Sequence, residues 1–229
     1  MLTGLLISLI VTVLAIHYFF VEQPRRKRLS VRPALPDPLP PREALNSVPD
    51  GAYLQTGFTW TRILDNGDVL VGIHPILVSL VGSPYSLKVM PEGWRVAKGS
   101  PVIRVRQGRR EIRIGSPVNG RIAEVNPNAC MEQGWILSGS GDDTCWIYRM
   151  EAPNIFHEAP LWLEGEEAEA WNREKYQQIR DHLSSAAAHQ EVGLALADGG
   201  EMPMGILGQL TDDAWEGFQD AFLPSVLKK

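Results

Sequence analysis

The sequence predicts a mainly β domain, sandwich-like or barrel-like in form, with one N-terminal transmembrane helix and a C-terminal α-helical extension. Residues 51–150 contain short β-branched and apolar runs separated by closely spaced turn signals, as in small β sandwiches and barrels. Residues 2–20 are apolar and uncharged, and residues 164–190 have the composition of a helix. We therefore divide the chain into a transmembrane anchor (1–22), a basic neck with a proline-rich linker (23–50), a β domain (51–152) and an acidic helical extension (153–229).

Charge is distributed unevenly along the chain. The 229 residues carry a formal net charge of −5 with 44% hydrophobic side chains, a composition that excludes wholesale disorder, collagen-like repeats and disulfide scaffolds. Residues 21–45 hold six basic and three acidic side chains, whereas residues 151–229 hold five basic and fifteen acidic ones. The mild total therefore combines a basic neck with an acidic end.

The apolar stretch from residue 2 to residue 20 is long enough to span a membrane. As a helix, its 19 residues reach about 28 Å. A cleaved signal peptide would carry its basic residues before the apolar run, whereas here bulky aromatic side chains and a basic cluster follow it. This cluster, which also suits contact with anionic lipid headgroups, consists of Arg25, Arg26, Lys27 and Arg28. The positive-inside bias thus predicts a single-pass protein of the inner (cytoplasmic) membrane, with its N-terminus outside and residues 21–229 in the cytoplasm.

The linker that follows is rich in proline. Residues 32–50 contain six prolines, so we expect an extended, polyproline-like chain and neither a helix nor an inner strand. Such a segment would act as a spacer between the anchor and the β domain.

The two cysteines, Cys130 and Cys145, are too few and too far apart for a structural zinc site. In a reducing cytoplasm they are most simply thiols. If the predicted topology were wrong, one disulfide between them would be the natural alternative.

Strands and turns alternate in the predicted β domain. The hairpin signal at 65–68 lies between the apolar runs 58–64 and 69–73. Further turn signals fall at 91–93, 98–101, 107–108, 115–117, 119–120 and 126–128.

Two helices are predicted in the acidic extension. Over 164–190, the expected buried side consists of Ala168, Trp171, Ile179 and Leu183. The second helix begins at Thr211, a suitable N-cap that two aspartates follow. Its apolar stripe, formed by Trp215, Phe218 and Phe222, either packs on its own domain or docks on a partner.

Several short motifs occur in a fixed order through the middle of the chain. They are Phe58–Trp60, Gly67–Ile73, Val81-Gly82 before a strand ending at Pro91, Val96–Pro101 and Ser116–Asn126, with either Gly134-Trp135 or Cys145-Trp146 before the last strand. In this order and spacing, residues 55–150 resemble the H protein of the glycine cleavage system, a lipoyl carrier. The resemblance implies a barrel-sandwich domain of the biotinyl/lipoyl type.

In that family, lipoate is attached to one lysine at a hairpin tip and swings between partner enzymes. Counting seven residues back from Ser116, and counting forward from Pro101, both lead to Arg109. A guanidinium is permanently protonated and is not a nucleophile that a lipoyl-attaching enzyme acylates. The resemblance therefore implies a carrier domain that has lost its lipoyl lysine, and we expect no cofactor and no metal.

Arginines crowd the sequence around this position: Arg104, Arg106, Arg109, Arg110 and Arg113. If the hairpin turns at 107–108, the first two share one face. The hairpin is either a solvated surface, partly neutralised by Glu111 and the acidic tail, or a docking surface for carboxylates or lipid headgroups. Nucleic acid is not an expected partner, because the domain is nearly neutral overall. We include Trp215, Phe218 and Phe222 in the candidate docking surface.

No catalytic set can be nominated, because the histidines are scattered and no nucleophile or phosphate-binding motif is present. The sequence favours a non-enzymatic accessory or assembly subunit that binds other subunits of a membrane complex. The preferred complexes are those of respiratory or photosynthetic electron transport. The alternative is a lipoyl-type carrier modified at Lys88 or Lys98. An enzyme that uses the acidic helical region is a third hypothesis, without named residues.

Overall fold

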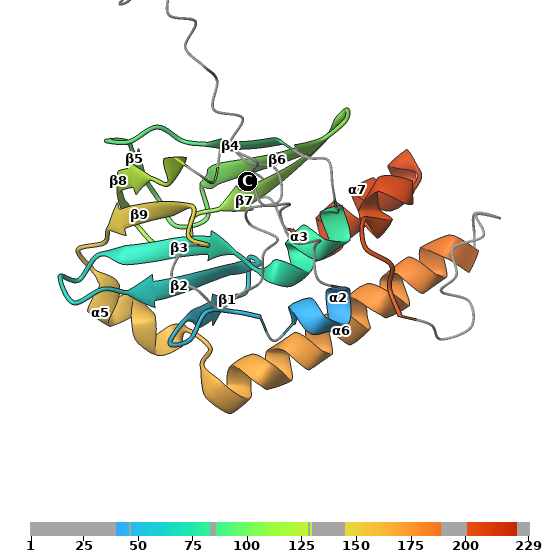
Figure 1. The fold of residues 1–229 in the computed structure, drawn as a ribbon, viewed down its shortest axis with the longest axis horizontal. Helices are drawn as coiled ribbons and strands as arrows, with labels where there is room; N and C mark the ends of the chain where they lie inside the picture. The colour runs from blue at the N-terminus through green and yellow to red at the C-terminus, as the bar shows by residue number, and fades with distance from the viewer. Residues whose placement is uncertain are drawn as a thin grey trace, which may run out of the picture. The chain divides into compact units, whose positions relative to one another are not determined.

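Nine strands form two antiparallel sheets in the described part of the chain (Figure 1). The computed structural model describes residues 40–45, 47–82, 86–127, 129, 145–188 and 201–223. The larger sheet has the order β1 (Tyr53–Gln55), β2 (Thr59–Ile63), β3 (Val69–Ile73), β9 (Tyr148–Glu151), β8 (Gly120–Val125) and β5 (Arg95–Val96). The smaller sheet has the order β4 (Ser86–Val89), β6 (Pro101–Gln107) and β7 (Arg110–Gly115). The expectation of a mainly β domain is confirmed.

The β2–β3 hairpin lies where the sequence predicts it. Ile63 pairs with Val69, and the turn between them contains Gly67 at a φ of +83°. The side-chain oxygen of Asn66 accepts a hydrogen bond from the backbone N–H of Asp68 at 3.0 Å. This local bond is the Asx geometry that makes Asn-Gly a hairpin signal.

A buried helix, α3 (Pro75–Val81), interrupts the region that the sequence assigns to strands and turns. Its apolar and β-branched residues give it the composition of a buried strand. The ring nitrogen Nδ1 of His74, however, accepts a hydrogen bond from the backbone N–H of Ile76 at 3.2 Å and caps the helix. Pro75 follows in the first turn, where its fixed φ and missing N–H suit a helix.

A second short helix, α2 (Pro41–Ala44), corrects the expectation that residues 32–50 run wholly extended. Pro41 stands at the start of this helix, the one helical position that tolerates proline well. The backbone N–H of Ala44 donates to the carbonyl of Pro40 at 2.9 Å, so the prolines begin the turn and do not prevent it.

Helical elements make up most of the described chain after β9. They are α5 (Ile155–Glu158), η2 (Ala159–Leu161), α6 (Gly165–Ala188), η3 (Ile206–Gln209) and α7 (Asp212–Phe222). The predicted N-cap is confirmed, since the hydroxyl of Thr211 accepts from the N–H of Ala214 at 3.4 Å. On α6, Ile179 and Leu183 are buried as expected, whereas Ala168 and Trp171 are half-buried.

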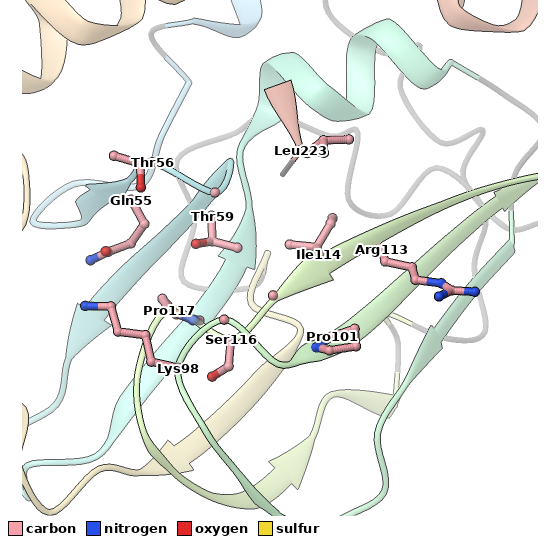
Figure 2. A pocket seen from close by; sticks show the side chains of 13 residues that line it. Gln55, Thr56, Thr59, Lys98, Pro101, Arg113, Ile114, Ser116, Pro117 and Leu223 are labelled. Carbon is pink, nitrogen blue, oxygen red and sulfur yellow. The ribbon is translucent and has the colours of Figure 1, made fainter. Parts of the chain in front are cut away.

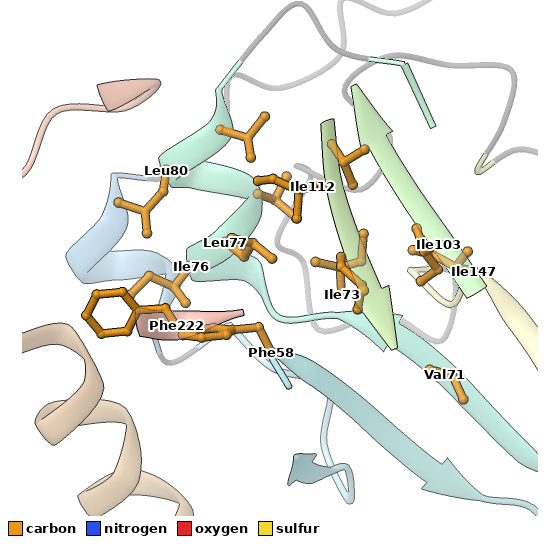
Figure 3. Close-up of a cluster of buried hydrophobic side chains, with 14 of the residues drawn as sticks. Phe58, Val71, Ile73, Ile76, Leu77, Leu80, Ile103, Ile112, Ile147 and Phe222 are labelled. Carbon is orange, nitrogen blue, oxygen red and sulfur yellow. The ribbon is translucent and has the colours of Figure 1, made fainter. Parts of the chain in front are cut away.

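One hydrophobic core joins the sheets to the helices. Figure 3 shows side chains of β3, α3, β6, β7 and α7 turned toward one another, among them Ile73, Leu77 and Ile112. Phe222 at the end of α7 belongs to the same buried cluster as Phe58 beside β2. The β domain and the helical extension therefore share their apolar interior, and burial of this surface stabilises both.

A chain of buried hydrogen bonds connects three of the helices. Nε2 of His74 lies 3.0 Å from the side-chain oxygen of Asn172 on α6. The side-chain nitrogen of Asn172 donates to the carbonyl of Leu45, the residue after α2, at 2.9 Å. With Nδ1 accepting from Ile76, the imidazole is neutral and carries its proton on Nε2. Sequence reasoning gave neither His74 nor Asn172 a role.

Within the ranges described above, no helix combines the length and the apolar character needed to cross a membrane. The predicted span at 2–20 and the basic cluster Arg25, Arg26, Lys27 and Arg28 lie outside the described residues. They stay predictions.

Candidate functional site

The tip of the β6–β7 hairpin carries Arg109. Gln107 pairs with Arg110, so the loop consists of Gly108 and Arg109 alone, one residue later than the turn that the sequence suggests. Gly108 has a φ of +60°, as expected for the first position of a tight hairpin turn that needs glycine. Arg109 is more exposed than its neighbour Arg110, with 83% of its side chain accessible. Its guanidinium reaches the carboxylate of Asp212 at 3.3 Å.

Arg110 lies at the start of β7 and fastens the hairpin to the C-terminal segment. Its guanidinium donates to the carbonyl of Leu207 at 2.8 Å and to that of Leu210, and it forms an ion pair with Asp212 at 3.2 Å. The guanidinium carbon also lies 5.2 Å from the ring centre of Trp215, within the range of a cation–π contact. Only 15% of the side chain is exposed. Arg110 is thus an internal link and not part of a docking surface, which corrects the sequence-based prediction.

The same hairpin is also bound to α3, again close to its tip. The side-chain nitrogen of Gln107 donates to the carbonyl of Val81, the last residue of α3, at 2.7 Å. Gly208 in η3 approaches Gln107 so closely that an added Cβ would lie 3.2 Å from its amide. Sequence reasoning missed Gln107, because its partners are distant in the chain and no local pattern marks it.

The aromatic stripe of α7 belongs to the interior of this chain. Trp215 is 5% exposed, Phe218 is fully buried and Phe222 is 8% exposed. Phe222 also meets the ring of His182 edge-on, with 5.4 Å between the ring centres. The inclusion of Trp215, Phe218 and Phe222 in a docking surface was therefore wrong, since their apolar faces already cover the core of this chain.

The other arginines of the hairpin face solvent together. Arg104 and Arg106 are exposed on β6, with the buried Val105 between them, so the expectation that they share one face is confirmed. Arg113 on β7 stands directly opposite Arg104 and is exposed as well.

Glu111 holds two of these arginines in place. One of its carboxylate oxygens accepts from Nε of Arg113 at 3.0 Å, and the other accepts from Arg106 at 3.3 Å. The hydrogen bond from Arg113 is the largest cause that lowers the pKa of Glu111, with further contributions from Arg106 and Arg104, while partial burial opposes them. Glu111 therefore stays ionised and orders the guanidinium groups beside it.

A cavity of about 240 Å³ lies beside the base of this sheet, between the β1–β2 turn and the segment 113–117 (Figure 2). Polar groups of Gln55, Thr59 and Ser116 line it together with Lys98, and Leu223 contributes an apolar side chain. Lys98 forms an ion pair with Glu158 at 3.5 Å. The residues of the hairpin tip are not among those that line the cavity.

The other candidate sites stay weak. Lys88 is exposed in the middle of β4. Among the residues that the structure describes, no three His, Cys, Asp or Glu side chains are grouped as a metal site would need. Cys145 is buried, and Cys130 falls outside the described ranges, so their pairing stays a prediction.

Comparison with known proteins identifies the family. A family model described as "Glycine cleavage H-protein" matches residues 52–175, which is more than half of the chain. The chain belongs to the glycine cleavage H-protein family. The matched region begins just before β1 and ends within α6, so it contains both sheets and the arginine hairpin.

Individual relatives are distant. "Glycine cleavage system H protein 3" of Aquifex aeolicus is 29% identical over 93 residues, which cover 40% of this chain and 56% of that protein. A "Probable glycine cleavage system H protein" of Thermococcus kodakarensis is 26% identical over 48% of this chain and 81% of its own length. The crystal structure of a glycine cleavage system H protein from Mycobacterium marinum aligns with a TM-score of 0.42 and 22% identity, over 46% of this chain and 87% of that one.

Proposed function

We propose that this chain is a non-catalytic, membrane-anchored accessory or assembly subunit of a larger membrane complex. Among such complexes we favour one of respiratory or photosynthetic electron transport. Its H-protein-like domain would serve there as a docking module. The observation that carries the proposal is the hairpin tip: the position that the H-protein motifs assign to the lipoyl lysine holds Arg109, whose guanidinium cannot be acylated.

The surroundings of the tip support the same proposal. A swinging carrier arm needs a tip that moves freely between partners. Here Asp212 binds both Arg109 and Arg110, and the carbonyls of Leu207 and Leu210 bind Arg110. The C-terminal segment therefore occupies the contacts around the tip, which suits a fixed structural module better than a carrier.

Membrane anchorage is the second part of the proposal. The uncharged stretch at 2–20 followed by Arg25, Arg26, Lys27 and Arg28 supports a single-pass protein of the inner membrane with its folded part in the cytoplasm. The basic cluster would contact anionic headgroups, and the partners would be subunits of the complex.

A carrier modified at another lysine is the alternative. Lys88 lies in mid-strand opposite Arg104. Lys98 lies between β5 and β6, which belong to different sheets, and pairs with Glu158, so neither side chain stands at a two-residue hairpin tip. Both are nevertheless exposed, and an exposed amine can in principle be acylated.

Two measurements on the native protein test the proposal. Intact-mass spectrometry should find the unmodified mass of the chain. A lipoyl mass that the Lys88→Arg or Lys98→Arg variant removes would establish the carrier alternative and overturn the docking proposal. After mild solubilisation of native membranes, the chain should migrate with other subunits in a large complex. Recovery only as a free monomer would contradict the accessory role.

A further inference from the structure

The outer face of the small sheet carries a cluster of cations whose geometry follows from the strand register. In antiparallel sheets, residues directly opposite each other share one face, with Cβ atoms about 5 Å apart. Lys88 on β4 is opposite Arg104 on β6, and Arg104 is opposite Arg113 on β7. Three cations thus form one row across all three strands. Arg106 lies in the next row, opposite Glu111.

This arrangement costs stability, because like charges directly opposite one another repel. Glu111 compensates Arg106 and Arg113 through its two oxygens. Within the described ranges, neither Lys88 nor Arg104 forms an ion pair with a carboxylate, although Arg104 acts on Glu111 at longer range and helps to lower its pKa. The facing pair Arg95 and Arg121 on the larger sheet differs, since Arg121 forms two hydrogen bonds with Glu151.

We propose that this face, formed by Lys88, Arg104, Arg106 and Arg113 and called here the cationic face, binds an acidic protein segment of a partner subunit. The inference rests on the proposed docking role and names the surface that performs it. Guanidinium groups offer paired donors that match the two oxygens of a carboxylate. Glu111 fixes two of the arginines before the partner arrives, so that fewer rotamers must be ordered on binding.

The size of the face suits a short segment. Adjacent strands are about 4.8 Å apart, so the row of three cations spans about 10 Å, and the second row lies about 7 Å along the strands. An extended chain with acidic side chains at alternate positions presents its carboxylates at the same spacing of about 7 Å.

A membrane surface fits this face less well. The groove beside Arg113 is lined on its α7 side by Glu216 and Asp220, which are exposed carboxylates. A flat anionic bilayer approaching the cationic face would meet these acidic groups as well, whereas a narrow segment need not. The large apolar side chains that are most exposed in the described residues, Trp94, Phe156 and Leu161, do not belong to the small sheet, so the face offers no apolar anchor for insertion.

Peptide binding to the purified full-length chain in detergent tests the proposal. The probe is a fluorescein-labelled hexapeptide of alternating glutamate and serine, and its glutamine–serine counterpart is the control. The double variant Lys88→Gln/Arg104→Gln should raise the Kd of the acidic peptide about three- to tenfold, since two exposed charge contacts are lost. The variant Arg173→Gln, which removes one positive charge from α6, should bind like the parent.

A stability measurement distinguishes arginines that are kept for binding from arginines that only face solvent. Because the row is repulsive, Arg104→Gln should raise the Tm by about 1–3 °C at low salt, and high salt should remove the difference. A gain in stability together with a loss of binding is the expected signature of residues kept for recognition.

Three results would overturn the inference. The first is no binding of the acidic peptide, and the second is equal binding by the parent and the double variant. The third is binding of short-chain phosphatidylserine, sensitive to the double variant, without binding of the peptide, which would assign the face to lipid. None of these results depends on the lipoyl mass or on co-purification, so failure of this inference is distinguishable from failure of the docking role.

Discussion

Lowering the pH from 7 to 5 should destabilise the fold by about 2 kcal/mol through His74 alone. This side chain is fully buried, and burial lowers its pKa from 6.5 to about 4, although the hydrogen bond with Asn172 acts in the opposite direction. Protonation would also place a proton on Nδ1, the atom that accepts from the N–H of Ile76 and caps α3. The neutral ring is therefore part of the folded structure.

The sign and size follow from the two pKa values. Below pH 6.5 the unfolded chain binds a proton at His74 that the folded chain takes up only near pH 4. The contribution of neutral His74 to the free energy of unfolding is therefore fully present above pH 6.5 and is lost as the pH falls toward 4. At pH 5 most unfolded molecules and few folded ones carry this proton, which corresponds to about 2 kcal/mol, and the loss approaches about 3 kcal/mol at pH 4. The pKa of Glu111 is lowered from 4.5, so that carboxylate contributes little between pH 7 and 5.

Urea unfolding followed by tryptophan fluorescence at pH 7 and pH 5 measures the effect. The matched control is His74→Asn, since asparagine can cap α3 without titrating. The parent should lose about 2 kcal/mol more than the variant over this interval. Should the variant not fold, NMR titration of His74 in the parent gives its pKa directly. Equal losses in the two proteins, or a His74 pKa near 6.5, would refute the reasoning.

Two further predictions concern the hairpin and the larger sheet. Arg110→Ala should lower the free energy of unfolding by about 1–3 kcal/mol, because the carbonyls of Leu207 in η3 and of Leu210 directly after it lose their charged donor. Arg109→Ala on the exposed tip should change the free energy of unfolding by at most about 1 kcal/mol. Equal effects in denaturant unfolding would show that Arg110 does not fasten the C-terminal segment. Gly72→Ala should lower it by about 1–3 kcal/mol or prevent folding, because a Cβ there would lie 2.2 Å from the ring of Trp60. A variant with parental Tm would contradict this close approach.

Local signals in the sequence were sufficient for several elements. The Asn-Gly turn before β3 and the Thr211 cap of α7 are determined by neighbouring residues, and both lie where the sequence predicts them. The motifs through the β domain also led to the correct family. Each of these inferences depends on contacts within a few positions of the chain.

Elements that depend on distant contacts were not predictable in the same way. The run at 75–81 has the composition of a strand, and its helix is explained by the cap at His74 together with Asn172, which lies about a hundred positions away. Likewise, the stripe on α7 was visible as a pattern, but a pattern does not reveal whether its partner is a second protein or this chain. The burial of Phe218 and the role of Arg110 emerge only from the tertiary arrangement.

The shared core has a consequence for how the protein is made. Trp215, Phe218 and Phe222 complete the apolar interior, and they lie on α7, which follows all nine strands in the order of the chain. During synthesis, both sheets leave the ribosome before the helix that covers them exists, so their apolar faces stay open until α7 has been translated. Exposed apolar surface of this kind favours aggregation and chaperone binding. Nascent chains arrested before residue 210 should therefore be held by chaperones, and release should coincide with the arrival of α7.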